Sequence, residues 1–181
     1  MRRIFETSLE RLGRMIASQH GLSIVFKGTV PCTDGKTIWL PSCSNLSDEL
    51  MSQMHGYLDH EVAHCLFTEF PEMKTGLLRD KRAEFHKSLF NACEDERIER
   101  LIILEYPGCR VNLKVINDKF GGDANKNARE KTIPWPIRLI LSIRAVMAET
   151  TPILDEETQE YFDLVKHLSE RLNECEDTKQ T

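Results

Sequence analysis

A long helical pattern with two histidines in its middle constrains this chain more than any other feature. From Ser47, a residue type that favours the N-cap position, apolar side chains recur every three or four residues to about Thr68, shortly before Pro71. Residues 59–64 within this pattern read DHEVAH. On a helix, His60 and His64 lie about 40° apart around the axis and one turn apart along it, so both imidazoles can face one ion.

The glutamate of this motif stands where a general base is needed. Glu61 follows His60 by about 100° around the helix, so its carboxylate lies beside the ion without having to bind it. A metal ion with an open position acidifies a bound water, and a neighbouring carboxylate takes up the proton. We therefore predict a zinc site with His60 and His64 as ligands and Glu61 as base. The alternative, a solvated surface helix, predicts more charge in VAHCLF than the sequence has.

A catalytic zinc ion needs a third protein ligand, and the next predicted helix, from about Leu78 to Glu105, offers one. Glu94 falls on the apolar stripe of this helix, and a carboxylate on a buried stripe needs a cation or a hydrogen-bond partner. We expect Glu94 to be the third ligand, with Asp95 as the alternative. The run EDERIER is otherwise typical of a solvated, salt-bridged helix face.

The rest of the chain predicts a mainly helical α+β fold in a single domain over residues 1–181, with a polar, frayed tail from about 173. Helices are expected over residues 4–18, 137–148 and 155–172. The runs LSIVFKG and TIWLP predict two short strands, with a hairpin as one arrangement. The segment 107–134, with FGGDANKN at its centre, is expected to be an irregular loop.

Composition narrows the class of partner. The chain of 181 residues has a net charge of −5 with both signs interspersed, which argues against a nucleic-acid surface. No apolar run approaches the roughly 20 residues that span a bilayer, so we expect no membrane partner and a cytoplasmic location. The six cysteines are scattered without CxxC spacing, so we expect reduced thiols and a metal held by histidine and carboxylate.

Several stretches, taken together, resemble a known family. HEVAH on one helix and a glutamate on the next resemble the gluzincin branch of the zincin metallopeptidases. IWLP, GYLDHEVAHCLFTEF, LFNACEDERIE and YPGCRVNL, over roughly residues 36–113, resemble the metallopeptidase-like N-terminal region of CobT-type von Willebrand factor A proteins and its stand-alone bacteriophage relatives. The resemblance implies a zincin-like domain with a small N-terminal sheet and an active-site helix.

The resemblance also implies a function and a site. In the zincin pattern His60, His64 and Glu94 bind Zn²⁺ and Glu61 is the base of a metallopeptidase acting on a peptide or protein, in the host cytoplasm if the chain is phage-encoded. The strand KTIWLP would be the edge strand along which an extended peptide adds. The alternative is a catalytically silent, zinc-stabilised module that binds a partner protein within a larger CobT-like assembly.

Two departures from the family pattern leave roles open. CobT-type proteins continue into a von Willebrand factor A domain, so we expect this chain to be a stand-alone form or a fragment. The position four beyond Glu94 is Ile98 rather than an acidic residue, so the partner that orients each histidine is open among three acidic residues: Asp59, Asp95 and Glu99. An oxyanion donor is equally open among Tyr57, His86, Arg97 and Tyr106. Another first-row ion would suit the same ligands.

Overall fold

A small sheet and a group of long helices make up the described part of the chain. The computed structural model describes residues 9, 11, 15, 19–42, 47–70, 83–129, 133–147, 151–152, 154–172 and 174–178. Within them lie β1 (Ser23–Phe26), β2 (Cys32–Thr33), β3 (Thr37–Leu40), α2 (Asp48–Phe67), α4 (Ala83–Glu105), α5 (Cys109–Arg129), α6 (Trp135–Met147) and α7 (Glu156–Leu172). This mainly helical α+β architecture confirms the predicted fold class.

The sheet has the order β1-β3-β2, with β1 parallel and β2 antiparallel to β3. The predicted hairpin between the two expected strands, now β1 and β3, is therefore wrong, because these strands are parallel. The hairpin is formed by β3 and a short additional strand, β2. Its turn is fixed by Asp34, whose carboxylate accepts hydrogen bonds from the backbone N–H groups of Lys36 and Thr37 at 2.9 and 2.7 Å. Gly35 supplies the positive φ of 91° that this turn requires.

The central position of β3 also corrects the expected edge strand. Both sides of β3 are already paired, one with β1 and the other with β2. β3 is therefore not an edge strand, and the edges of the sheet are β1 and β2. Ile38 and Leu40 of β3 are fully buried and pack into the core.

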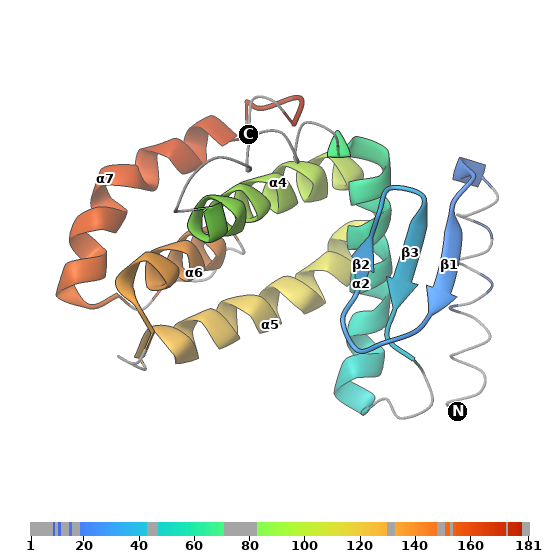
Figure 1. Ribbon diagram of the computed structural model, residues 1–181, viewed down its shortest axis with the longest axis horizontal. Helices are drawn as coiled ribbons and strands as arrows, with labels where there is room; N and C mark the ends of the chain where they lie inside the picture. The colour runs from blue at the N-terminus through green and yellow to red at the C-terminus, as the bar shows by residue number, and fades with distance from the viewer. Residues whose placement is uncertain are drawn as a thin grey trace.

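Helix α2 separates the sheet from the other helices. It begins after Ser47, whose hydroxyl accepts a hydrogen bond from the backbone N–H of Leu50 at 3.1 Å. In Figure 1 the sheet lies at one end of the molecule against α2, and α4, α5, α6 and α7 extend from the other side of that helix. The core combines buried side chains from both sides of α2: Leu9, Ile38, Leu40, Met54, Leu58, Val62, Ala63, Ile98, Ile102, Leu113 and Ile116.

Helix α5 was predicted as an irregular loop, and this was wrong. The segment is helical through Gly121 and Gly122, although each glycine costs about 1 kcal/mol in a helix interior. Leu113 and Ile116 are each 1 % exposed and belong to the core cluster. Burial of such side chains contributes about 1.5–3 kcal/mol each, which outweighs the weak local propensity.

Two further expectations concern the ends of the chain. The predicted helix over 4–18 lies largely outside the described residues, although Leu9 is helical and fully buried. The tail was expected to be frayed, but its described part, residues 174–178, packs on α4: the guanidinium of Arg97 donates to the carbonyl of Glu176 at 3.0 Å, and Thr178 is 2 % exposed. No helix of the described residues has the length and apolarity to span a bilayer.

Candidate metal centre

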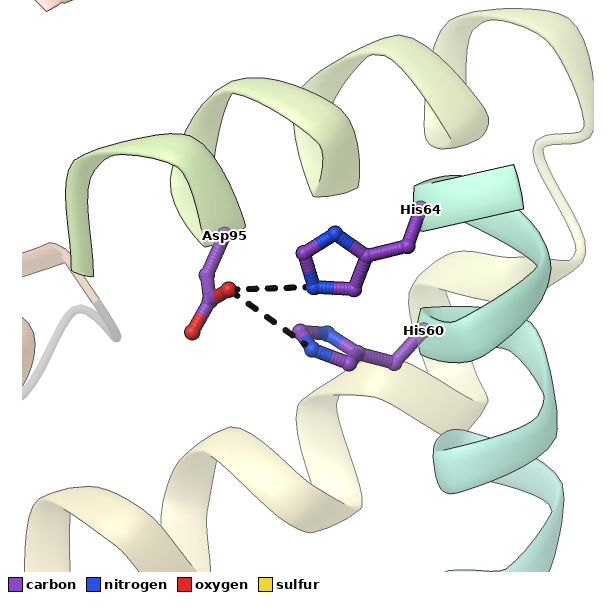
Figure 2. A group of neighbouring side chains, drawn as sticks. All are labelled: His60, His64 and Asp95. Atoms are coloured by element: carbon purple, nitrogen blue, oxygen red, sulfur yellow. Dashed lines mark ion pairs between the residues drawn. The ribbon is translucent and has the colours of Figure 1, made fainter. Parts of the chain in front are cut away.

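Two histidines of α2 and one carboxylate of α4 point toward a common centre. Nε2 of His64 lies 3.2 Å from Oδ1 of Asp95, and Nε2 of His60 lies 3.8 Å from the same oxygen. The three side chains converge in Figure 2, with the histidines one turn apart on α2. One ligand atom from each residue lies within 4.8 Å of the others. This is the only such group of at least three potential ligands among the residues that the structure describes.

Glu94, the expected third ligand, lies in a different environment. It is fully buried, as its place on the apolar stripe predicted. Its two carboxylate oxygens accept hydrogen bonds from Nε and Nη2 of Arg97 at 2.9 and 2.7 Å. Neighbouring positions on a helix point about 100° apart, so the face of α4 that meets the histidines carries Asp95 while Glu94 faces Arg97. The cation that balances Glu94 is therefore an arginine, and the residue beside the histidines is the alternative, Asp95.

His60 is oriented by an acidic residue one turn further along α4. Its Nδ1 lies 2.8 Å from Oε1 of Glu99, and the other oxygen of Glu99 accepts from Asn117 at 2.6 Å. An ionised carboxylate only accepts, so Nδ1 of His60 carries the proton and Nε2 is directed toward Asp95. Of the three orienting candidates, Glu99 contacts His60, whereas Asp59 accepts from Asn112 of α5 at 2.8 Å.

His64 is oriented through a hydroxyl. Its Nδ1 lies 3.0 Å from Oγ1 of Thr68, which itself donates to Oε1 of Glu94 at 2.8 Å. A threonine hydroxyl has one proton, so Thr68 must accept from the histidine and Nδ1 must be the donor. Nε2 of His64 then faces Oδ1 of Asp95 at 3.2 Å, so that both atoms can bind one metal ion.

The charged groups of the site shift the pKa values of His60 and Asp95 in opposite directions. Burial alone would lower the pKa of His60, but the hydrogen bond to Glu99 and the charges of Asp95, Glu99 and Glu61 outweigh it and raise the pKa to about 9. Burial opposes ionisation of Asp95, yet its hydrogen bond with His64 and the charges of His60 and Arg144 lower the pKa of Asp95 to about 2. The protein therefore maintains an anionic carboxylate beside a position that favours a cation.

Glu61, the predicted base, is on the same turn of α2 as the histidines and is 5 % exposed. Burial raises the pKa of its carboxyl, and nearby Asp95 adds to this, while the charges of His60 and His64 act in the opposite direction. A carboxylate with a raised pKa is a better proton acceptor near neutral pH. Glu61 therefore lies on the HExxH turn with a carboxyl whose pKa is influenced by all three residues of the centre, and its role as base stays a prediction.

Arg144, like Thr68 and Asn117, is a residue of the site that was not found from the sequence. Nη2 of Arg144, in α6, lies 3.0 Å from Oδ2 of Asp95, and its guanidinium lies 5.1 Å from the ring centre of Phe120. The two oxygens of Asp95 are therefore divided between the histidines and this arginine. No local pattern marks Arg144, because it reaches the site through the packing of α6 on α4 and α5, and α5 was predicted as a loop.

The candidate oxyanion donors make contacts elsewhere. The hydroxyl of Tyr57 donates to Gln53 at 2.9 Å, and that of Tyr106 lies 3.3 Å from Nε2 of His20.

The two basic candidates are also engaged elsewhere. Arg97 is 1 % exposed and bound to Glu94. His86 is exposed, and its ring centre lies 6.0 Å from that of Phe85. These described contacts do not bring any of the four to His60, His64 or Asp95.

The donor set fits a transition-metal ion. Two imidazole nitrogens and one carboxylate oxygen are the ligands of many three-ligand zinc sites. Each side chain here is also held by a further residue: His60 by Glu99, His64 by Thr68 and Asp95 by Arg144. Other first-row ions accept the same donors. A cavity of about 20 Å³ adjoins the centre, enough for about one water molecule; its lining is Ala92, Asp95, Glu96, Glu99, Asn117, Phe120 and Arg144.

Fold and site together define the class: a mainly helical α+β protein in which an HExxH helix and a neighbouring helix form a candidate metal centre. The chain belongs to the CobT family, since the family model described as cobalamin biosynthesis protein CobT matches residues 3–173. No curated protein and no solved structure matches the chain. The match supports the CobT part of the resemblance, and membership of the zincin peptidases stays a prediction.

Proposed function

We propose that this protein is a metal-dependent hydrolase of peptide bonds, in which His60, His64 and Asp95 hold a divalent ion, most simply Zn²⁺, and Glu61 is the general base. The observation that carries the proposal is the convergence of the three ligand atoms within 4.8 Å of one another on the turn of α2 that also bears Glu61. The proposal replaces Glu94 by Asp95 as third ligand, because Glu94 is bound to Arg97.

The chain's own residues account for most of the proposed chemistry. A bound zinc ion would supply Lewis acidity, acidifying water and polarising a carbonyl group. Glu61 accepts the proton at its carboxylate and passes it to the leaving amine. Glu99 and Thr68 hold Nδ1 of His60 and of His64, so that both Nε2 atoms remain directed at the centre. Arg144 holds the second oxygen of Asp95 and limits its rotation.

The proposal is tested by metal content and turnover together. Elemental analysis of the purified protein should give about one ion per chain, and Asp95→Ala should remove it. Glu61→Gln should retain the ion and abolish cleavage of a peptide library. His55→Ala, a change on the same helix outside the HExxH motif, is the matched control and should retain both. A wild-type chain with stoichiometric metal and no cleavage of any peptide would refute the enzymatic part.

A second function is favoured by the low exposure of Glu61 and the small volume of the adjoining cavity. Glu61 is 5 % exposed, and the cavity beside the centre has the volume of about one water molecule. A catalytically silent, metal-stabilised module that binds a partner protein needs no open site. This function predicts that chelation of the ion lowers the melting temperature of the wild-type chain and of Glu61→Gln equally, and that neither cleaves peptides.

A further inference from the structure

The segment 174–178 is far from the metal centre in sequence but is joined to it by buried hydrogen bonds. The Thr178 hydroxyl donates to Oε1 of Glu94 at 3.0 Å and accepts from the backbone N–H of Glu69 at 2.9 Å and from Nη2 of Arg97 at 3.2 Å. One donor and two acceptor positions exhaust the capacity of a hydroxyl. The segment lies beyond residues 3–173, the range of the family match.

The connection from Thr178 to the centre continues through two residues. Oε1 of Glu94 also accepts from Thr68 at 2.8 Å, and Oγ1 of Thr68 lies 3.0 Å from Nδ1 of His64. Thr178, Glu94 and Thr68 are 2 %, 0 % and 9 % exposed, so water does not readily replace a lost partner within this chain of bonds.

Backbone contacts hold the segment in place. Arg97 donates to the carbonyl of Glu176 at 3.0 Å, and Arg100 donates to the carbonyl of Cys175 at 2.5 Å. Arg97 also donates to the carbonyl of Phe67, at the end of α2, at 2.7 Å. The same arginine thus joins the segment, Glu94 and the helix that carries both histidines.

We propose that Thr178 is a positioning residue of the metal centre: acting through Glu94 and Thr68, it holds His64 in the orientation in which Nδ1 donates to Thr68 and Nε2 faces the ion. The donor and acceptor roles along these contacts determine which tautomer of His64 is favoured. While Thr68 gives its only proton to Glu94, it accepts from His64. Loss of the Thr178 bond lets the Glu94 carboxylate, still paired with Arg97, shift about that pair. Such a shift frees Thr68 to donate to Nδ1 and so favours the wrong tautomer.

The test compares three threonine variants by their zinc affinity, measured in competition with a chromophoric chelator. Thr68→Val breaks the contact to His64 itself and should weaken binding about 10- to 100-fold, as is typical when the residue that orients a metal ligand is lost. Thr178→Val should weaken it less, by about 3- to 10-fold, and Thr178→Ser should restore it. Thr158→Val is the matched control, since Thr158 is 1 % exposed and also accepts from an arginine, Arg138, at 3.2 Å.

The inference rests on the proposed role of His64 as a ligand. A second measurement distinguishes failure of the inference from failure of the proposed function. In metal-free protein labelled with ¹⁵N-histidine, the Nδ1–H proton of His64 should exchange slowly with water. Thr178→Val should accelerate this exchange, whereas Thr158→Val should not. A wild-type chain that binds no zinc would end the proposed function, and faster exchange in Thr178→Val would then still show that Thr178 orients His64. Unchanged zinc affinity and unchanged proton exchange in Thr178→Val would overturn the inference alone.

Discussion

The Glu94 carboxylate and the Arg97 guanidinium form a buried two-point ion pair, at 2.9 Å from Nε to Oε2 and 2.7 Å from Nη2 to Oε1. The pair explains why a buried glutamate on α4 does not serve the histidines of α2. Breaking a buried pair by removing one partner typically costs about 3–5 kcal/mol, so Glu94 contributes to stability and Asp95 to the metal centre.

This division predicts different phenotypes for two adjacent substitutions. Asp95→Asn should weaken zinc binding by more than about 100-fold, beyond the effect of residues that only orient a ligand. It should also lower the free energy of unfolding of the metal-free protein, because the ion pair with Arg144 is lost. Glu94→Gln should lower that free energy by about 3 kcal/mol and retain more zinc affinity than Asp95→Asn. Urea denaturation and zinc titration measure the two quantities for both variants. A larger loss of zinc affinity in Glu94→Gln than in Asp95→Asn would restore Glu94 as the ligand.

Glu99 is expected to act on the ion through His60. Glu99→Gln keeps the size of the side chain but removes the charge that accepts from Nδ1 of His60, so zinc affinity should fall by about 10- to 100-fold. Glu160→Gln, an exposed change on α7, serves as control and should have no effect. Equal affinities of the two variants would show that the 2.8 Å contact does not orient the ligand.

The metal-free protein should lose stability as the pH rises above neutrality. The pKa of His60 is about 9 in the folded chain against 6.5 for an unperturbed histidine. Its protonation therefore stabilises the fold fully below pH 6.5, and this contribution is lost as the pH rises through about 9. The free energy of unfolding, measured with a chelator present, should fall across this window, and Glu99→Gln should flatten the slope. A rise in stability across the window would contradict the assignment.

Metal binding should release that same proton. At a pH between 6.5 and 9, His60 is largely protonated without the ion, and a ligand nitrogen must lose its proton to bind. Calorimetric titration with zinc in buffers of different ionisation enthalpy should give about one proton released per ion near pH 7.5. Binding without proton release in this range would show that His60 is neutral beforehand.

The approach of α2 to α5 depends on a glycine. A Cβ added at Gly56 would lie 2.5 Å from the carbonyl oxygen of Asn112 and 2.8 Å from Cγ2 of Ile116. Gly56→Ala should therefore cost about 1–3 kcal/mol, since two helices must move apart. Gly122→Ala on α5 meets no atom within 4 Å and should stabilise by about 0.5–1 kcal/mol. Thermal denaturation of both variants checks this contrast, and a neutral Gly56→Ala would refute the close packing.

The sequence by itself determined the elements with strong local signals. The N-cap Ser47, the apolar periodicity of α2 and the HExxH spacing fixed the helix and the faces of His60 and His64, because helical geometry relates residues four apart whatever their surroundings. Burial of Glu94 followed from its place on an apolar stripe. The helices α6 and α7 were found within two residues of their observed ends.

Tertiary structure decided which residues the faces of α2 and α4 contact. Only the rotation of α4 against α2 put Asp95 rather than Glu94 opposite the histidines, and neighbouring helical positions differ by about 100°. Arg144, the helical state of α5 and the parallel pairing of β1 with β3 likewise depend on contacts between segments far apart in the chain. Local propensity carries no information about such contacts, since burial between elements outweighs it.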